Sequence, residues 1–229
     1  MSFSEKFYLN FIKDDRWKYL TTGLQNTIVI AFCAVLIGVA IGFFIALVRT
    51  THDKTGKMKI LNFIAKLYLT IIRGTPALIQ LLIIYYVVFA SIDINKILVA
   101  SVAFGLNSAA YVAEIFRSGI MSIDRGQMEA GRSLGLNYNT TMWLIIMPQA
   151  IKNILPALGN EFIVLLKETS ISGYIAIQDL TKGGDIIRSR TYEALLPLVA
   201  VALIYLVMVI GLEKLVALLE RRLAKSDYR

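Results

Sequence analysis

Residues 19–48 read YLTTGLQNTIVIAFCAVLIGVAIGFFIALV, a run of 30 residues without one charged side chain. A hydrocarbon core about 30 Å thick needs roughly 20 apolar residues, because a helix rises about 1.5 Å per residue. The run is therefore long enough to cross a bilayer. It is also too long for the apolar part of a signal peptide, and acidic residues precede it. It predicts a membrane helix that is not cleaved off.

Four more stretches of this kind follow. Uncharged runs of 19, 17, 19 and 19 residues begin after Arg73, Lys96, Arg132 and Glu193. The composition, 57% hydrophobic and 17% charged, excludes a disordered chain, a coiled coil and an ordinary cytosolic enzyme. We predict an all-α integral membrane protein whose transmembrane domain, 24–215, has five helices at about 24–48, 61–90, 97–118, 146–166 and 194–215.

The positive charges indicate the direction of crossing. Five crossings place the chain ends on opposite faces, and the face that carries the tail 216–229 holds 12 Lys and Arg against 9 on the other. Because cytoplasmic loops are enriched in Lys and Arg, we expect a cytoplasmic C-terminus and an N-terminus outside. We interpret the formal charge of +8 as the excess of Lys and Arg in cytoplasmic loops of a membrane protein, and we expect no nucleic-acid partner.

The first 23 residues form a separate N-terminal segment. Phe3, Phe7 and Phe11 recur at helical spacing among charged residues. This pattern predicts an amphipathic helix over 3–15 that lies on the outer membrane surface. The alternative is that these residues are only the frayed start of the first span.

Residues for several other chemistries are absent. Cys33 is the only cysteine and His52 the only histidine, so we expect no internal disulfide, no metal site and a solvated histidine. The sequence has no phosphate-binding loop and no dinucleotide fingerprint. We therefore expect a chain that is not an enzyme and binds no cofactor.

The loop 122–142 gives the strongest functional signal. It begins SIDRGQMEAGRSLG and predicts a short cytoplasmic helix over 124–136. Asp124 and Gln127 are placed to cap this helix, and Gly135 to stop it.

This helix has two faces of different character. Gly126, Ala130 and Ser133 would line one face with small groups, so that a partner could approach closely. Glu129 and Arg132 would form an i,i+3 pair on another. These features favour a docking element, and the alternative is a solvated connecting helix.

The same loop resembles a known motif. The residues that carry the resemblance are Glu129-Ala130-Gly131, Gly135, Ile145 and Met147-Pro148. Their spacing is similar to the EAA loop of binding-protein-dependent ABC importer permeases, with Gly131 in place of the second Ala and Met147 in place of Leu. The resemblance implies coupling to an ATPase subunit through Gly126, Glu129, Ala130, Gly131, Arg132, Gly135 and Pro148.

Three further segments resemble the polar amino acid branch of that family. They are RGTPALIQ at 73–80, AYVAEIFR at 110–117 and NEFIVLLKETS at 160–170. The resemblance implies a permease subunit in a prokaryotic cytoplasmic membrane. It would pair with a second permease copy or relative, with two ATPase subunits that bind ATP and Mg, and with an extracytoplasmic amino-acid-binding protein.

One charge lies deep in a predicted span. Glu161 is nine residues beyond Lys152, about 13 Å deeper in a regular helix. A carboxylate at that depth is costly unless it is paired or protonated. Pro156 and Gly159 nearby would loosen the helix. We hypothesise that Glu161 faces a central cavity and receives a cationic group of the cargo. The alternatives are a structural partner on a neighbouring helix and a protonated carboxyl.

Other polar groups are weaker candidates. Asn107 and Ser108, midway along the third span, would line the path or only join helices, and Asn160 stands next to Glu161. Glu114 is three residues before Arg117, which favours an intrahelical pair.

Two segments suggest moving parts. Arg73 precedes a Gly-Thr-Pro sequence, where it would cap or brace a break that is either a hinge or a simple kink. The external segment 167–193 is a candidate outer gate and contact surface for the binding protein.

Together these features predict an importer permease for polar, basic amino acids that resemble arginine, lysine or histidine. The same class of permease for glutamine or another neutral polar amino acid is the alternative. A secondary transporter or channel would show inverted repeats or ion sites, which the sequence lacks. A membrane anchor for an enzyme would leave Glu161 without a role.

Overall fold

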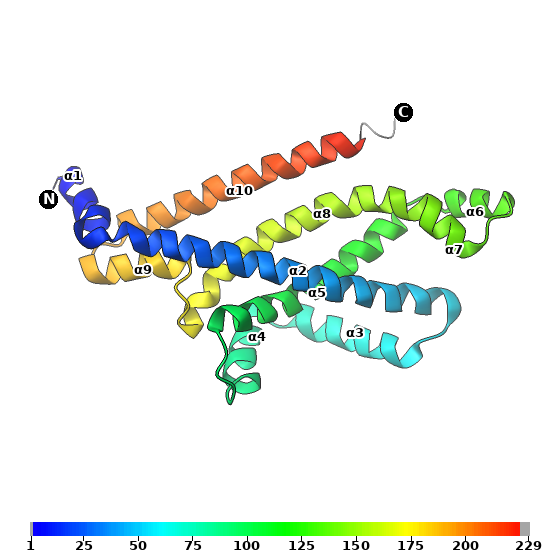
Figure 1. The fold of residues 1–229 in the computed structure, drawn as a ribbon, viewed down its shortest axis with the longest axis horizontal. Coiled ribbons are helices and arrows are strands. Elements are labelled where there is room, and N and C mark those ends of the chain that lie inside the picture. The colour runs from blue at the N-terminus through cyan, green and yellow to red at the C-terminus, as the bar shows by residue number, and fades with distance from the viewer. Residues whose placement is uncertain (1, 225–229) are drawn as a thin grey trace.

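The computed structural model describes residues 2–224 as an elongated bundle of helices, with no strand in that range. The long helices α2, α8 and α10 run along the long axis (Figure 1). The short helices α1 and α9 lie at one end of the bundle, the α9 end (Figure 1). Helices α6 and α7 and the α2–α3 turn lie at the other, the α6 end (Figure 1).

The bundle is built around helix α2, Trp17–Thr55, and helix α5, Lys96–Met121. These helices approach closely because small residues lie between them. A Cβ on Gly42 would lie 2.8 Å from the carbonyl oxygen of Ala109, and one on Gly38 would lie 2.9 Å from the Ser108 hydroxyl. Glycines four residues apart let two membrane helices bring their backbones together. The predicted spans 24–48 and 97–118 are thus confirmed as longer helices.

The predicted second span is not one straight helix. Helix α3, Lys59–Gly74, and the pair formed by α4, Ala77–Ile83, and the π-helical turn η3, Ile84–Val88, meet at 111°. Pro76 precedes α4 and has no N–H to continue the hydrogen bonds of α3. The predicted span 61–90 is therefore broken, and the break that the Gly-Thr-Pro sequence suggested is present.

The fourth span follows the loop helices. The loop 122–142, called the coupling loop below, contains α6, Arg125–Ser133, and α7, Tyr138–Thr141. A π-helical turn η4, Met142–Ile146, then leads into α8, Met147–Glu168. Within residues 2–224, α2, α5, α10 and the bent α3–α4 pair have the length and hydropathy of membrane spans. Helix α8 is long enough at 22 residues but more polar.

The last span is longer than predicted. Helix α10, Leu195–Ala224, continues nine residues past the expected end at 215. The remainder of the expected tail, 225–229, lies outside the described residues. The external segment before α10 contains a 3₁₀ helix η5, Thr169–Ile175, and α9, Leu180–Thr191.

The N-terminal segment is helical but broken. It consists of α1, Phe3–Phe7, a π-helical turn η1, Tyr8–Ile12, and a 3₁₀ turn η2, Lys13–Asp15. Positive φ values of 55° and 53° at the last two residues of η2 separate it from α2. The segment is therefore distinct from the first span. Asn10 is buried and accepts a hydrogen bond from the Thr191 hydroxyl at 2.8 Å, which joins it to α9.

Candidate functional site

The intramembrane carboxylate has a structural partner. The Ser108 hydroxyl of α5 donates to Glu161 Oε1 of α8 at 2.7 Å, and Glu161 is half-buried. No Lys or Arg lies within ion-pair distance of Glu161 in the described part of the chain. The carboxyl group is thus oriented by one hydroxyl and has no cationic partner among the described residues.

Asn107 belongs to a different group. Its Nδ2 donates to Gln80 Oε1 at 2.9 Å, and both side chains are buried. Gln80 in turn donates through Nε2 to the carbonyl oxygens of Ile72 and Thr75 and to the Thr75 hydroxyl, at 2.8, 3.1 and 2.8 Å. These carbonyls lie at the break between α3 and α4. Gln80 therefore donates hydrogen bonds to the carbonyl groups at the helix break, and Asn107 holds the Gln80 side chain in place. Both side chains are buried and do not face an open path.

The sequence analysis missed Gln80 and assigned the brace to Arg73. The Arg73 guanidinium instead lies 5.9 Å from the centroid of the Tyr111 ring on α5. A signal for Gln80 was present, because it is the only polar residue in α4 and follows Pro76 by four positions. Asn160 is exposed and makes no hydrogen bond within the described chain. Of the predicted binding residues, only Glu161 and Ser108 meet.

A basic cleft lies beside the α2–α5 contact. It has a volume of 460 Å³ and is lined by Arg49, Lys66, Leu69, Thr70, Arg73, Glu114 and Arg117. The predicted pair between Glu114 and Arg117 is confirmed at 3.7 Å. Glu114 also pairs with Arg49 of α2 at 3.5 Å, and Arg117 with Asp53 at 3.6 Å. These contacts join the ends of two helices, a relation that intrahelical spacing did not reveal.

The coupling loop begins and ends as predicted, with two corrections. Asp124 caps α6 by accepting from the Gly126 N–H at 2.6 Å, so the reciprocal cap with Gln127 does not form. Gly135 has φ +83° and ends the helix. Glu129 and Arg132 are exposed, and neither has an ion-pair partner among the described residues. The expected pair between them was therefore wrong.

Gly131 has a structural reason to be glycine. It is the buried residue of α6, and a Cβ there would lie 2.5 Å from the Thr141 methyl group of α7. The departure from alanine in the EAA pattern thus matches a tight contact between the two loop helices. Gly126, Ala130 and Ser133 remain exposed, and Pro148 is exposed in the first turn of α8. The predicted small-residue face is available to a partner.

At the α9 end, the chain before α9 is bonded to α2. The Leu180 N–H donates to the Thr27 hydroxyl at 3.1 Å, and Asn26 Nδ2 donates to the carbonyl oxygen of Gln178 at 2.9 Å. Asp179 is fully buried and caps α9 by accepting from the Lys182 N–H at 2.9 Å. Burial raises the pKa of the Asp179 carboxyl to about 6, against the opposing effect of the backbone N–H groups.

The bundle, with several helices apolar and long enough to cross a bilayer, is the fold of a multi-pass membrane protein. Residues 38–225 match the family described as binding-protein-dependent transport system inner membrane component. The chain belongs to this family. Membership implies an ATPase partner and a substrate-binding protein.

Curated relatives include amino acid permeases. The chain is 38% identical over 192 residues to the probable amino-acid ABC transporter permease protein YckA of Bacillus subtilis (strain 168), covering 83% of each chain. It is 37% identical to the arginine transport system permease protein ArtQ of the same organism, covering 91% of this chain and 94% of the relative. It is 36% identical to the putative glutamine transport system permease protein GlnP of Rickettsia bellii (strain RML369-C), with the same coverage.

Solved structures agree on the fold. A crystal structure of an amino acid ABC transporter with histidines matches with a TM-score of 0.85 and 43% identity, covering 97% of this chain and 99% of that one. The inward-facing MetNI methionine ABC transporter matches with a TM-score of 0.77 over 92% of this chain. At 19% identity, this second match supports the fold alone.

Proposed function

We propose that this chain is the permease subunit of an ATP-driven importer for polar amino acids with a basic side chain. The observation that carries the proposal is Glu161, a half-buried carboxyl group that one hydroxyl orients and that no cation among residues 2–224 neutralises. A negative charge at that depth is unfavourable until a cation reaches it. The ammonium or guanidinium of a basic amino acid supplies that cation. One relative is named for arginine transport and another for glutamine transport, so their names do not decide between a basic and a neutral cargo.

A free amino acid also carries a carboxylate, and the bundle offers a cation for it. Ser108 and Tyr111 are three residues apart on α5, so their Cβ atoms are about 5–6 Å apart. Glu161 contacts Ser108, and Arg73 lies over Tyr111. The acidic Glu161 and the basic Arg73 therefore contact neighbouring positions of α5. We assign the cargo side chain to Glu161 and its carboxylate to Arg73.

The exposed loop helix supplies the energy coupling in this scheme. Glu129, Ala130 and Arg132 face outward from α6 and would contact one of two ATPase subunits, which hold ATP and Mg. A second permease copy or relative would complete the path. The α6 end is cytoplasmic and the α9 end, where the binding protein would dock, is outside. The C-terminus is then cytoplasmic and the N-terminus extracytoplasmic.

The test is the ratio of arginine to glutamine uptake by the reconstituted transporter. We expect Glu161→Gln to lower this ratio by about tenfold, which corresponds to loss of about 1.4 kcal/mol of selectivity. Glu213→Gln, which removes an exposed carboxylate from α10, is the matched control and should leave the ratio unchanged. An unchanged ratio in Glu161→Gln would overturn the assignment of the cargo side chain to Glu161. Uptake without ATP would show that the chain is a secondary transporter and not part of an ATP-driven importer.

A further inference from the structure

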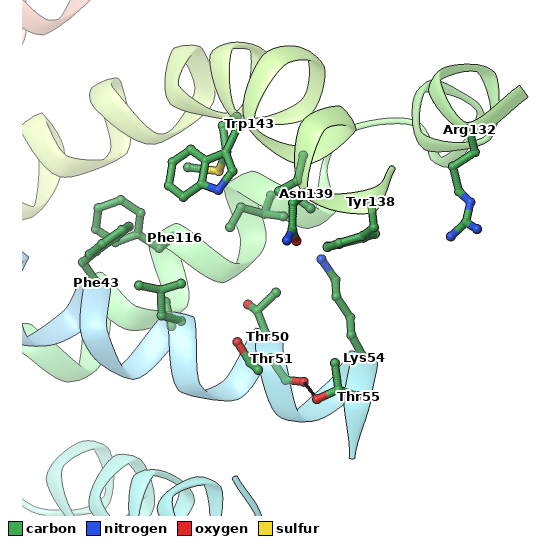
Figure 2. A pocket seen from close by; sticks show the side chains of 15 residues that line it. Phe43, Thr50, Thr51, Lys54, Thr55, Phe116, Arg132, Tyr138, Asn139 and Trp143 are labelled. Atoms are coloured by element: carbon green, nitrogen blue, oxygen red, sulfur yellow. Dashed lines mark hydrogen bonds between the residues drawn. The ribbon is translucent and has the colours of Figure 1, made fainter. Parts of the chain in front are cut away.

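A second cavity lies away from the basic cleft and from Glu161. It has a volume of 510 Å³ and lies between the last turns of α2, the end of α5 and the coupling loop. Figure 2 shows that its side chains divide into two groups. Aromatic rings gather at one side, and hydroxyl and cationic groups at the other (Figure 2). The aromatic group is Phe43, Phe116 and Trp143.

The polar side of this cavity is positively charged. Lys54 and Arg132 are its only charged lining residues, and no acidic residue lines it. The Lys54 ammonium lies 4.4 Å from the centroid of the Tyr138 ring, and neither cation has an acidic partner among the described residues. The Tyr138 hydroxyl is buried without a hydrogen-bond partner in the described chain. By contrast, the neighbouring cleft that also includes Lys54 contains Asp53 and Asp124.

The cavity is continuous with an apolar surface. Leu47, which lines it, is 44% exposed, and the adjacent Phe44 is 59% exposed on the same helix. Trp143 lines the other side and is 58% exposed. Tryptophan favours the boundary between hydrocarbon and head groups. An occupant with both an acyl chain and an anionic head group matches these walls, whereas a soluble anion would leave the aromatic side unfilled.

We propose that this cavity binds an anionic phospholipid of the cytoplasmic leaflet, which rests on the orientation given in the proposed function. The phosphate lies at the Lys54 ammonium, within reach of the Tyr138 hydroxyl, and an acyl chain packs on the aromatic rings. Basic pockets between membrane helices on the cytoplasmic side are suited to such head groups. Because Lys54 belongs to α2 and the cavity-lining Tyr138 to α7, the lipid joins the loop 122–142 to the first membrane helix.

The experiment measures lipid bound to the purified full chain, with the ATPase subunit when it copurifies. Native mass spectrometry gives the preference for phosphatidylglycerol over phosphatidylcholine. We expect Lys54→Gln to lower this preference about fivefold, the change that roughly 1 kcal/mol per basic side chain produces. Lys57→Gln removes the same charge from an exposed residue outside the cavity and should leave the preference unchanged. Equal losses in both variants, or no loss in either, would overturn the proposal.

A second variant does not depend on charge. Thr51→Trp places a large ring in the cavity, and we expect one fewer tightly bound lipid per chain. An unchanged lipid count in this variant contradicts the proposal. Loss of the lipid when two copies of the chain associate also contradicts it, because the second copy would then occupy the cavity. Lipid binding needs neither transport nor ATP. If the chain binds the lipid but does not associate with an ATPase, the proposed function is wrong and the lipid site is still supported.

Discussion

Gly23 and Gly183 let backbone touch backbone where α9 packs on α2, whereas Gly131, the buried glycine of α6, touches a side chain. A Cβ on Gly23 would overlap the carbonyl of Asp179, and one on Gly183 would overlap the carbonyl of Tyr19. A Cβ on Gly131 would meet only the Thr141 side chain. A side chain can move aside and a backbone cannot. The contrast indicates that the contact between α2 and α9 is rigid and that the contact between α6 and α7 can adjust, as the proposed docking of an ATPase subunit on α6 requires.

The largest expected effect is at the rigid contact. Gly183→Ala should destabilise the protein by about 3 kcal/mol or more, because the added methyl group meets backbone that is fixed by hydrogen bonds. Thermal unfolding in detergent measures this. Gly211→Ala in α10 is the matched control, since nothing lies within 4 Å of a Cβ there. It should be neutral or slightly stabilising. Equal effects of the two substitutions would remove the contrast between the two contacts.

The buried Asp179 predicts a pH dependence at the same contact. The pKa of its carboxyl is about 6, above the ordinary value of 3.8. Between about pH 4 and pH 6 the unfolded state loses its proton first, so the unfolding free energy falls as pH rises, by about 2 kcal/mol over the window. Above pH 6 the effect is complete. Asp179→Asn keeps the cap and should lose this slope. The difference between the two unfolding curves across pH 4–7 is the measurement, and parallel curves would contradict the prediction.

The adjustable contact predicts a smaller and repairable effect. Gly131→Ala should cost about 1–2 kcal/mol of stability, since the Thr141 side chain must shift. It should also lower coupled ATP hydrolysis. Thr141→Ser in the same chain removes the methyl group but keeps the hydroxyl that donates to the Asn137 carbonyl at 3.0 Å. We expect this second change to restore part of the activity, because the hydroxyl would still lie 2.9 Å from the added Cβ. A double variant as impaired as the single one would show that Gly131 acts through another contact.

The smallest effect on stability is expected at the exposed face of α6. Glu129→Ala should change the unfolding free energy by less than about 0.5 kcal/mol, because the side chain is exposed and has no partner among residues 2–224. Copurification of the ATPase subunit should nevertheless fall. Gln127→Ala is the control, as it is exposed on the same helix and outside the proposed contact set. Retention of the ATPase by the Glu129 variant would contradict a docking role.

The sequence predicted features that depend on local pattern. Uncharged length located the membrane helices, and Gly135 marked the end of α6, because both follow from neighbouring residues alone. The 111° bend between α3 and α4 did not follow, because a Gly-Thr-Pro sequence indicates a break and not its angle. The longer α2 was also missed, since charged residues continue a helix beyond the hydrocarbon.

Contacts between distant residues were the main gap in the candidate site. Asn107 was placed on the path, but its amide is bonded to Gln80, 27 positions away. The bond between Glu114 and Arg49 was missed for the same reason. Glu161 was identified because an isolated carboxylate in a membrane span is costly wherever its neighbours lie. Its bond to Ser108 required the structure.

The most direct test is ATP hydrolysis by the purified complex of this chain with its ATPase subunit and binding protein, measured with arginine, lysine, histidine and glutamine in turn. The account predicts that the three basic amino acids stimulate hydrolysis more than glutamine does, and that Glu161→Gln removes this preference. Equal stimulation by glutamine and arginine in the unaltered complex, or a preference that survives in Glu161→Gln, would contradict it.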